Sequence, residues 1–126
     1  MSYDTDVRID TGSGELSEVA EVGNITSNIG RMFYAAMPGP FEGGGRYDGT
    51  GEPEARGGLT GLSGLLCRDA LPFIAAGLDA MRDREVEMRA MEPGNGWGSY
   101  GGALQYLQKT YEACERHPNA TLCVNW

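Results

Sequence analysis

The periodicity of the apolar residues changes twice along this chain, and these changes constrain the fold more than any other feature. Residues 3–10 and 121–126 alternate apolar and polar side chains, as half-buried strands do. Between them, apolar residues in 59–84 and 102–115 recur at spacings of three and four, the pattern of amphipathic helices. Strands at both ends with helices between them predict a sheet that joins the two ends of the chain.

Shorter elements complete this prediction. Residues 16–22 favour a second strand, which would form a hairpin with the first, and residues 31–37 favour a short helix. Pro72 indicates either a kink or the start of a new helix, because proline is tolerated in a first helical turn. Residues 86–91 indicate one more helical turn. We therefore expect an α+β fold, in which a small antiparallel sheet of about three strands, two N-terminal and one C-terminal, carries three to four helices on one face.

The chain has 126 residues, which predicts a single domain over 1–126. Residues 38–58 are rich in glycine and proline and follow neither periodicity. A connection of this length is either a functional flap or a disordered segment. Its aromatic and arginine side chains would suit a flap over a ligand, whereas the entropy cost of fixing its glycines favours a flexible loop.

Charge and cysteine content narrow the function classes. The net charge is −8, which predicts repulsion from nucleic-acid backbones and anionic lipid. Cys67, Cys114 and Cys123 lack metal-ligand spacing, and His117 is the only histidine. We expect reduced thiols, no metal and no cofactor. There is no apolar run of the ~20 residues that a membrane span needs and no signal-peptide pattern, so we expect a soluble, cytoplasmic protein.

The segment Asn95-Gly96-Trp97-Gly98-Ser99-Tyr100 is the strongest indication of a binding site. Its glycines make positive φ accessible and leave backbone N–H groups uncovered. The indole offers a flat face and one donor, and the segment leads into a predicted helix, whose N-terminus favours an anion or a carbonyl. In the alternative interpretation this is a tight turn with a buried tryptophan. The predicted ligand-binding residues here are Asn95, Gly96, Trp97, Gly98 and Tyr100.

A second polar segment precedes the helix predicted over 31–37. Asn24, Thr26 and Asn28 alternate with apolar residues, so an extended backbone would send all three to one side. A helix N-cap needs one or two such side chains, which leaves a surplus for a ligand. In the alternative, all three serve capping and turn bonds.

Motifs for catalysis are weak. Residues 96–101 satisfy G-x-G-x-x-G, but no predicted strand precedes them, as a dinucleotide site requires. Glu92 is a single carboxylate without an evident partner, and His117 is expected to end a helix at the surface. We predict no catalytic residue and rank an enzyme last.

The motifs resemble those of a family of small uncharacterised proteins from phages of actinobacteria and their hosts. The family shares Asn-x-Thr-x-Asn near the start, Asn-Gly-Trp-Gly before an aromatic residue and a helix, and Cys-x-x-x-Pro before a last strand. This chain matches the last motif at Cys114 and Pro118. The resemblance covers the start and the second half of the chain, while the glycine-rich segment 38–58 departs from the family's compact connection. It implies a phage setting but no activity.

Two classes of function remain open. In the first, which we favour, the chain is a non-catalytic phage accessory protein that sequesters a small nucleotide-like or other planar polar ligand, as an anti-defence protein would. Both polar segments precede helices, so their free N–H groups would converge on one ligand. In the alternative, the chain is a protein–protein interaction or virion-associated protein. Its partner would then be a host protein or a second copy in a homo-oligomer, and the motifs would only hold the fold.

Overall fold

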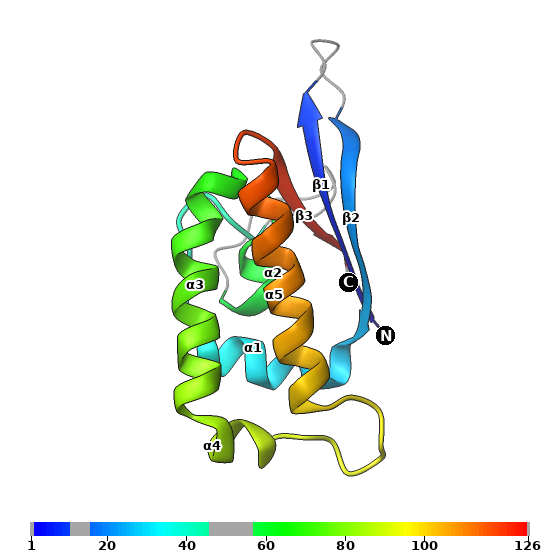
Figure 1. Cartoon of the computed structure of the whole chain (residues 1–126), viewed down its shortest axis with the longest axis vertical. Coiled ribbons are helices and arrows are strands. Elements are labelled where there is room, and N and C mark those ends of the chain that lie inside the picture. Colours follow the sequence, from blue (N-terminus) through cyan, green and yellow to red (C-terminus); the bar gives the residue numbers. More distant parts are fainter. Residues whose placement is uncertain (1, 11–15, 46–56, 126) are drawn as a thin grey trace.

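The computed structural model describes residues 2–10, 16–45 and 57–125, and its fold is α+β (Figure 1). Three antiparallel strands form one sheet in the order β2-β1-β3. They are β1 (Ser2–Asp10), β2 (Leu16–Thr26) and β3 (Thr121–Asn125). Two strands come from the start of the chain and one from its end, which confirms the predicted architecture.

The helices cover one face of this sheet (Figure 1). The two long helices, α3 and α5, lie side by side, and α1 crosses beneath them near the end of β2. None of the described helices is both long enough and apolar enough to cross a membrane. The helical elements are η1 (Ser27–Ile29), α1 (Gly30–Ala36), α2 (Gly58–Gly61), α3 (Cys67–Asp83), α4 (Glu85–Arg89) and α5 (Tyr100–Arg116).

The core lies between the sheet and the helices. Thr5 and Val7 on β1 are buried there and pair with Val124 and Leu122 on β3, which are buried too. Leu107 on α5 is fully buried in the same cluster. The period-2 patterns at the two ends of the sequence therefore correspond to one shared inner face.

Strand β2 is longer than predicted and contains two extra residues. Its pairing with β1 skips Val22 and then Val19, so each of these residues forms a bulge. Gly23, with φ of +114°, allows the strand to continue past the first bulge where the sequence predicted its end. The strand therefore reaches Thr26 and takes Asn24 with it. Bulges twist an edge strand and discourage pairing with another chain.

The helical segment predicted over 59–84 forms two separate helices, and the break between them lies before Pro72. Helix α2 ends at Gly61 and α3 begins at Cys67, with Pro72 inside α3, so the predicted alternative of a helix starting at Pro72 is wrong. Residues between the two helices pair with β3 instead. Gly64 N donates to Leu122 O at 2.8 Å, and Leu122 N donates to Leu65 O at 2.9 Å. This pairing covers the outer edge of β3 and ends the helical pattern there.

Part of the predicted loop 38–58 packs against the helical layer. Phe41 is buried, and its ring lies 4.5 Å from that of Phe73 on α3. Residues 46–56 of the predicted loop, which include its arginines, lie outside the described residues, as do residues 11–15 of the predicted hairpin.

Candidate functional site

An open hollow of about 660 Å³ lies where β1 begins, β2 ends and the loop between α4 and α5 passes. This region is at the lower right of Figure 1. Both polar segments singled out in the sequence contribute to it, although they lie far apart in the chain. Its lining residues are Ser2, Asn24, Ile25, Thr26, Asn28 and Trp97.

The register of β1 and β2 explains why the polar side chains share one side. Ser2 pairs with Thr26, and Asp4 pairs with Asn24, on the face of the sheet opposite the helices. Asn24 Nδ2 donates to Tyr3 O at 3.2 Å and to Asp4 Oδ1 at 2.8 Å. The side-chain nitrogen of Asn24 is therefore hydrogen-bonded within the protein. The Asp4 carboxylate is close to the hollow, because it is bonded to Asn24, which lines it.

Only one of the three residues in Asn-x-Thr-x-Asn acts as a cap. Thr26 Oγ1 accepts a hydrogen bond from Asn28 N at 3.3 Å and so caps η1. Helix α1 follows from Ile29 without a side-chain cap. The Asn28 side chain is exposed, and among the described residues it has no hydrogen-bond partner. Its carboxamide is thus a donor and an acceptor at the hollow.

The loop before α5 holds the indole out of the core. Asn95 Oδ1 accepts from Trp97 N at 2.9 Å, and Gly96 has φ of +78°, which together form a tight turn. Trp97 is 68% exposed, so the alternative of a buried tryptophan is wrong. Asn95 and Gly96 shape the turn without lining the hollow.

Gly98 joins the two segments by packing. A Cβ at this position would lie 2.6 Å from Ile29 Cγ2 and 3.1 Å from Thr26 Cγ2. The glycine therefore lets the loop approach the end of β2 more closely than a larger residue would. The sequence predicted that Gly98 contacts a ligand, whereas in the structure it contacts the protein.

Tyr100 is a core residue, and the start of α5 is capped internally. The Tyr100 side chain is 3% exposed, and its hydroxyl donates to Met81 O at 2.9 Å. Its backbone N–H donates to Glu92 Oε1 at 2.8 Å, while Ser99 Oγ accepts from Gly102 N at 3.0 Å. The amides of Tyr100 and Gly102, which the sequence offered to a ligand, are thus used within the chain, and Glu92 serves as a cap.

The described lining of the hollow mixes polar and apolar groups and contains no cation. Its described lining consists of hydroxyl, carboxamide, indole and isoleucine groups, with no lysine or arginine. Within the described parts of the chain, no group of three His, Cys, Asp or Glu side chains is placed to hold a metal ion. Ser2 and Ile25 were missed by the sequence reasoning. The strand register, which places Ser2 opposite Thr26, was the information needed to find Ser2.

Comparison with known proteins adds no relative. Neither protein-family models, nor curated proteins, nor solved structures match this chain. The resemblance to phage proteins remains a prediction from the motifs.

Proposed function

We propose that the protein is a non-catalytic binding protein whose hollow holds a planar polar group against the indole of Trp97. The observation that carries this proposal is an indole that is 68% exposed at the same hollow as the carboxamide of Asn28, which has no hydrogen-bond partner in the described part of the chain. An exposed tryptophan next to convergent polar groups is typical of a recognition site. The stacked group would gain contact with the ring while its edge pairs with the carboxamide.

The lining favours binding over catalysis. No carboxyl, imidazole or thiol is among the described side chains that line the hollow, so a group for proton transfer or nucleophilic attack is not supplied there. We therefore assign the hollow a recognition role.

The ligand class that fits is a planar group with hydrogen-bonding edges, such as a nucleobase. A nucleotide would be recognised through its base, because the described lining has no cation for the phosphate and the chain carries a net charge of −8. The motif resemblance implies a phage-infected cell as the setting, and there the protein would sequester a nucleotide-like signal.

A protein partner is the second function, and the openness of the hollow favours it. Small-molecule sites enclose most of their ligand, whereas this hollow leaves Trp97 largely exposed. Exposed tryptophan is enriched where protein surfaces meet. A host protein or a second copy of the chain would then cover the indole.

Fluorescence titration of Trp97 tests whether the hollow binds planar groups. The sequence has two tryptophans, so the Trp126→Phe variant leaves Trp97 as the only indole. We expect saturable quenching by nucleosides or by guanidinium-bearing compounds, and loss of binding in Trp97→Ala as measured by calorimetry. Tyr34→Ala, which removes an exposed aromatic ring on α1, is the matched control and should bind as the parent does.

Two results would count against the proposal. One is the absence of quenching by any planar compound at millimolar concentration. The other is unfolding of Trp97→Ala, since an exposed side chain should change the free energy of unfolding by only about 0.5 kcal/mol.

A further inference from the structure

We infer that the planar group is the guanidinium of an arginine on a basic polypeptide, which docks on the hollow and the adjoining outer face of the sheet. This inference rests on the proposed function of the hollow and specifies its ligand. It combines the exposed indole, the Asp4 carboxylate beside the hollow and the sign of the charges on β1 and β2.

A guanidinium matches the two kinds of group found together here. Its flat face stacks on an indole through a cation–π interaction, and its edge donates hydrogen bonds to carboxylate or carboxamide oxygens. Trp97 supplies the face and is 68% exposed. Asp4 is exposed and is bonded to the lining residue Asn24 at 2.8 Å, so a carboxylate is close to the hollow.

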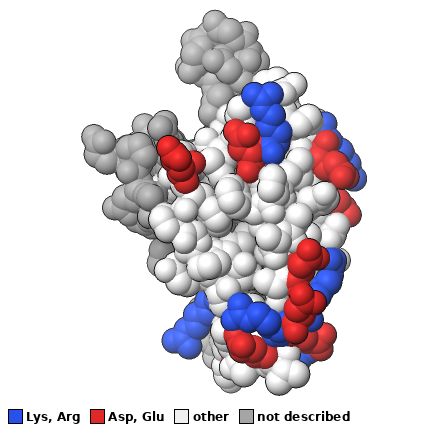
Figure 2. All heavy atoms as spheres, turned by 90° about the vertical axis from the view of Figure 1, so that its left-hand side faces the viewer, with Lys and Arg blue, Asp and Glu red and all other residues white. Residues whose placement is uncertain are grey.

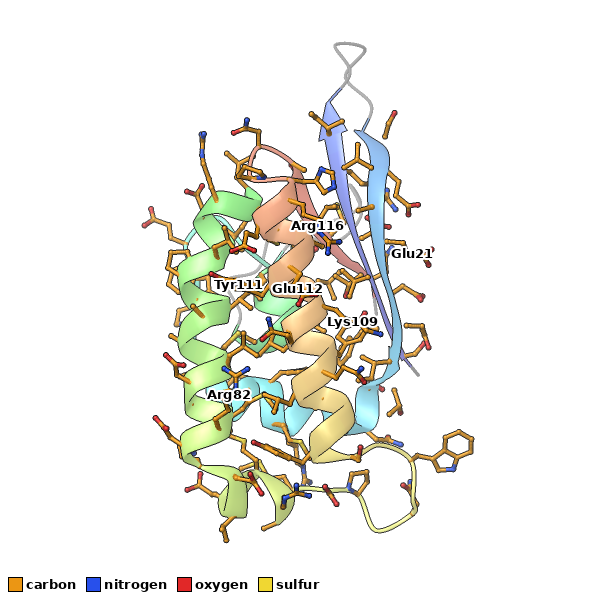
Figure 3. The ribbon with its side chains drawn as sticks, viewed as in Figure 1. Glu21, Arg82, Lys109, Tyr111, Glu112 and Arg116 are labelled. Atoms are coloured by element: carbon orange, nitrogen blue, oxygen red, sulfur yellow. The ribbon has the colours of Figure 1, made fainter. Side chains whose placement is uncertain are left out.

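The outer face of the sheet continues this acidic character. Glu21 and Glu18 on β2 pair with Asp6 and Arg8 on β1, so all four lie on the face that the described helices leave uncovered. Both glutamates are exposed, and Figure 3 shows Glu21 projecting away from α5. Arg8 is engaged by Asp6, with Nε to Oδ1 at 2.8 Å and Nη2 to Oδ2 at 3.0 Å.

The carboxylates on this face also influence one another. The pKa of Glu18 is raised, first by desolvation and then by the neighbouring Asp6 and Glu21, while Arg8 opposes the shift. A cationic partner would relieve this crowding.

The opposite side of the molecule has a different charge pattern. On the face that α3 covers, acidic and basic side chains lie beside one another (Figure 2). On α4, Arg89 pairs with Glu85 at 2.8 Å, and Glu87 pairs with Arg84, the residue just before the helix. Charge on α4 is therefore compensated by nearby residues, whereas the exposed glutamates on β2 have a single basic neighbour in the paired rows. A basic surface would be attracted to the sheet side.

Other ligands satisfy only part of this chemistry. A neutral nucleobase would use the indole and the carboxamide but not the carboxylates. A lysine would use the carboxylates but has no planar face to stack. Arginine alone among the side chains combines planarity with a permanent positive charge.

Peptide titrations of the full chain test the inference. The probes are hexa-arginine, hexalysine and hexacitrulline, which carry charge and planarity, charge alone, and planarity alone. Using calorimetry and Trp97 fluorescence in Trp126→Phe, we expect hexa-arginine to bind about tenfold more tightly than either other peptide. Trp97→Ala and Asp4→Asn should each weaken hexa-arginine binding by about tenfold. Added salt should weaken it further.

The controls separate a specific site from general charge attraction. Tyr34→Ala removes an exposed aromatic ring on α1, and Glu87→Gln removes an exposed carboxylate on α4, and both should retain the parent affinity. Equal binding of hexalysine, or equal loss in the two controls, would overturn the inference. Binding of the nucleosides that test the proposed function, without binding of hexa-arginine, would overturn the inference and leave the proposed function standing. If no planar probe binds, both the inference and the proposed function are wrong.

Discussion

Replacing Gly98 with alanine tests how the loop that carries Trp97 is held against the sheet. Gly98 has φ of +108°, which L-residues rarely adopt. An added Cβ would lie 2.6 Å from Cγ2 of Ile29, whose side chain is fully buried and cannot move aside without disturbing the core. We expect Gly98→Ala to lower the free energy of unfolding by about 3 kcal/mol, from roughly 1–2 kcal/mol of backbone strain and roughly 1–3 kcal/mol of overpacking.

Two neighbouring glycines separate these two costs. Gly96 has φ of +78° but no atom within 4 Å of an added Cβ, so Gly96→Ala should show only the backbone cost of about 1–2 kcal/mol. Gly94 has neither a positive φ nor a close neighbour. Gly94→Ala should therefore be neutral or stabilise by up to about 1 kcal/mol, because alanine restricts the unfolded chain.

Urea-induced unfolding followed by circular dichroism measures all three variants under one set of conditions. For a chain of this size, a loss of about 3 kcal/mol corresponds to a fall in Tm of roughly 10 °C. If Gly98→Ala is no less stable than Gly96→Ala, then the close contact with Ile29 and Thr26 is not a constraint. In that case the explanation of how Trp97 is positioned is wrong.

Two further predictions concern contacts that join distant parts of the chain. Tyr106 donates its hydroxyl to Gly23 O at 2.6 Å, so Tyr106→Phe should cost about 1–2 kcal/mol. Burial raises the Tyr106 pKa to about 12, so the folded state disfavours ionisation of this tyrosine. The free energy of unfolding should therefore fall between pH 10 and 12, and it should fall less steeply in Tyr106→Phe. Unfolding measured as a function of pH checks this. Ser63 Oγ accepts from Val124 N at 3.0 Å and donates to Val124 O at 3.3 Å. Ser63→Ala should cost about 1–3 kcal/mol and speed hydrogen exchange of the Val124 amide, and unchanged protection would contradict this.

The fold could be predicted because its terminal strands have clear inner faces. Val7 and Leu122 are both fully buried and directly paired, and each sits in an alternating pattern that is visible in the sequence. The break between α2 and α3 could not be predicted in the same way. It depends on backbone hydrogen bonds between residues 64–67 and residues 120–122, and apolar spacing does not reveal such bonds. The sequence analysis placed a possible helix start at Pro72, which in the structure lies within α3.

The candidate site was predicted in outline but not residue by residue. Asn24, Thr26, Asn28 and Trp97 meet at the hollow because the strand register and the loop bring them together. Glycine and tyrosine serve recognition and packing equally well, so the sequence could not show that Gly98 contacts the core or that Tyr100 lies within it. Only the surrounding side chains make that distinction.

The loop that presents Trp97 is held in place at its base, whereas the side chain at its tip makes few contacts with the rest of the protein. The base is secured by Gly98 against Ile29 and by Tyr100 against Glu92, whereas the indole itself contributes little burial. Substitutions at position 97 can therefore alter what the surface displays with little penalty to folding. This arrangement would let recognition diversify among descendants of the chain while the scaffold stays the same, and it makes this position a natural one to randomise when selecting new binders.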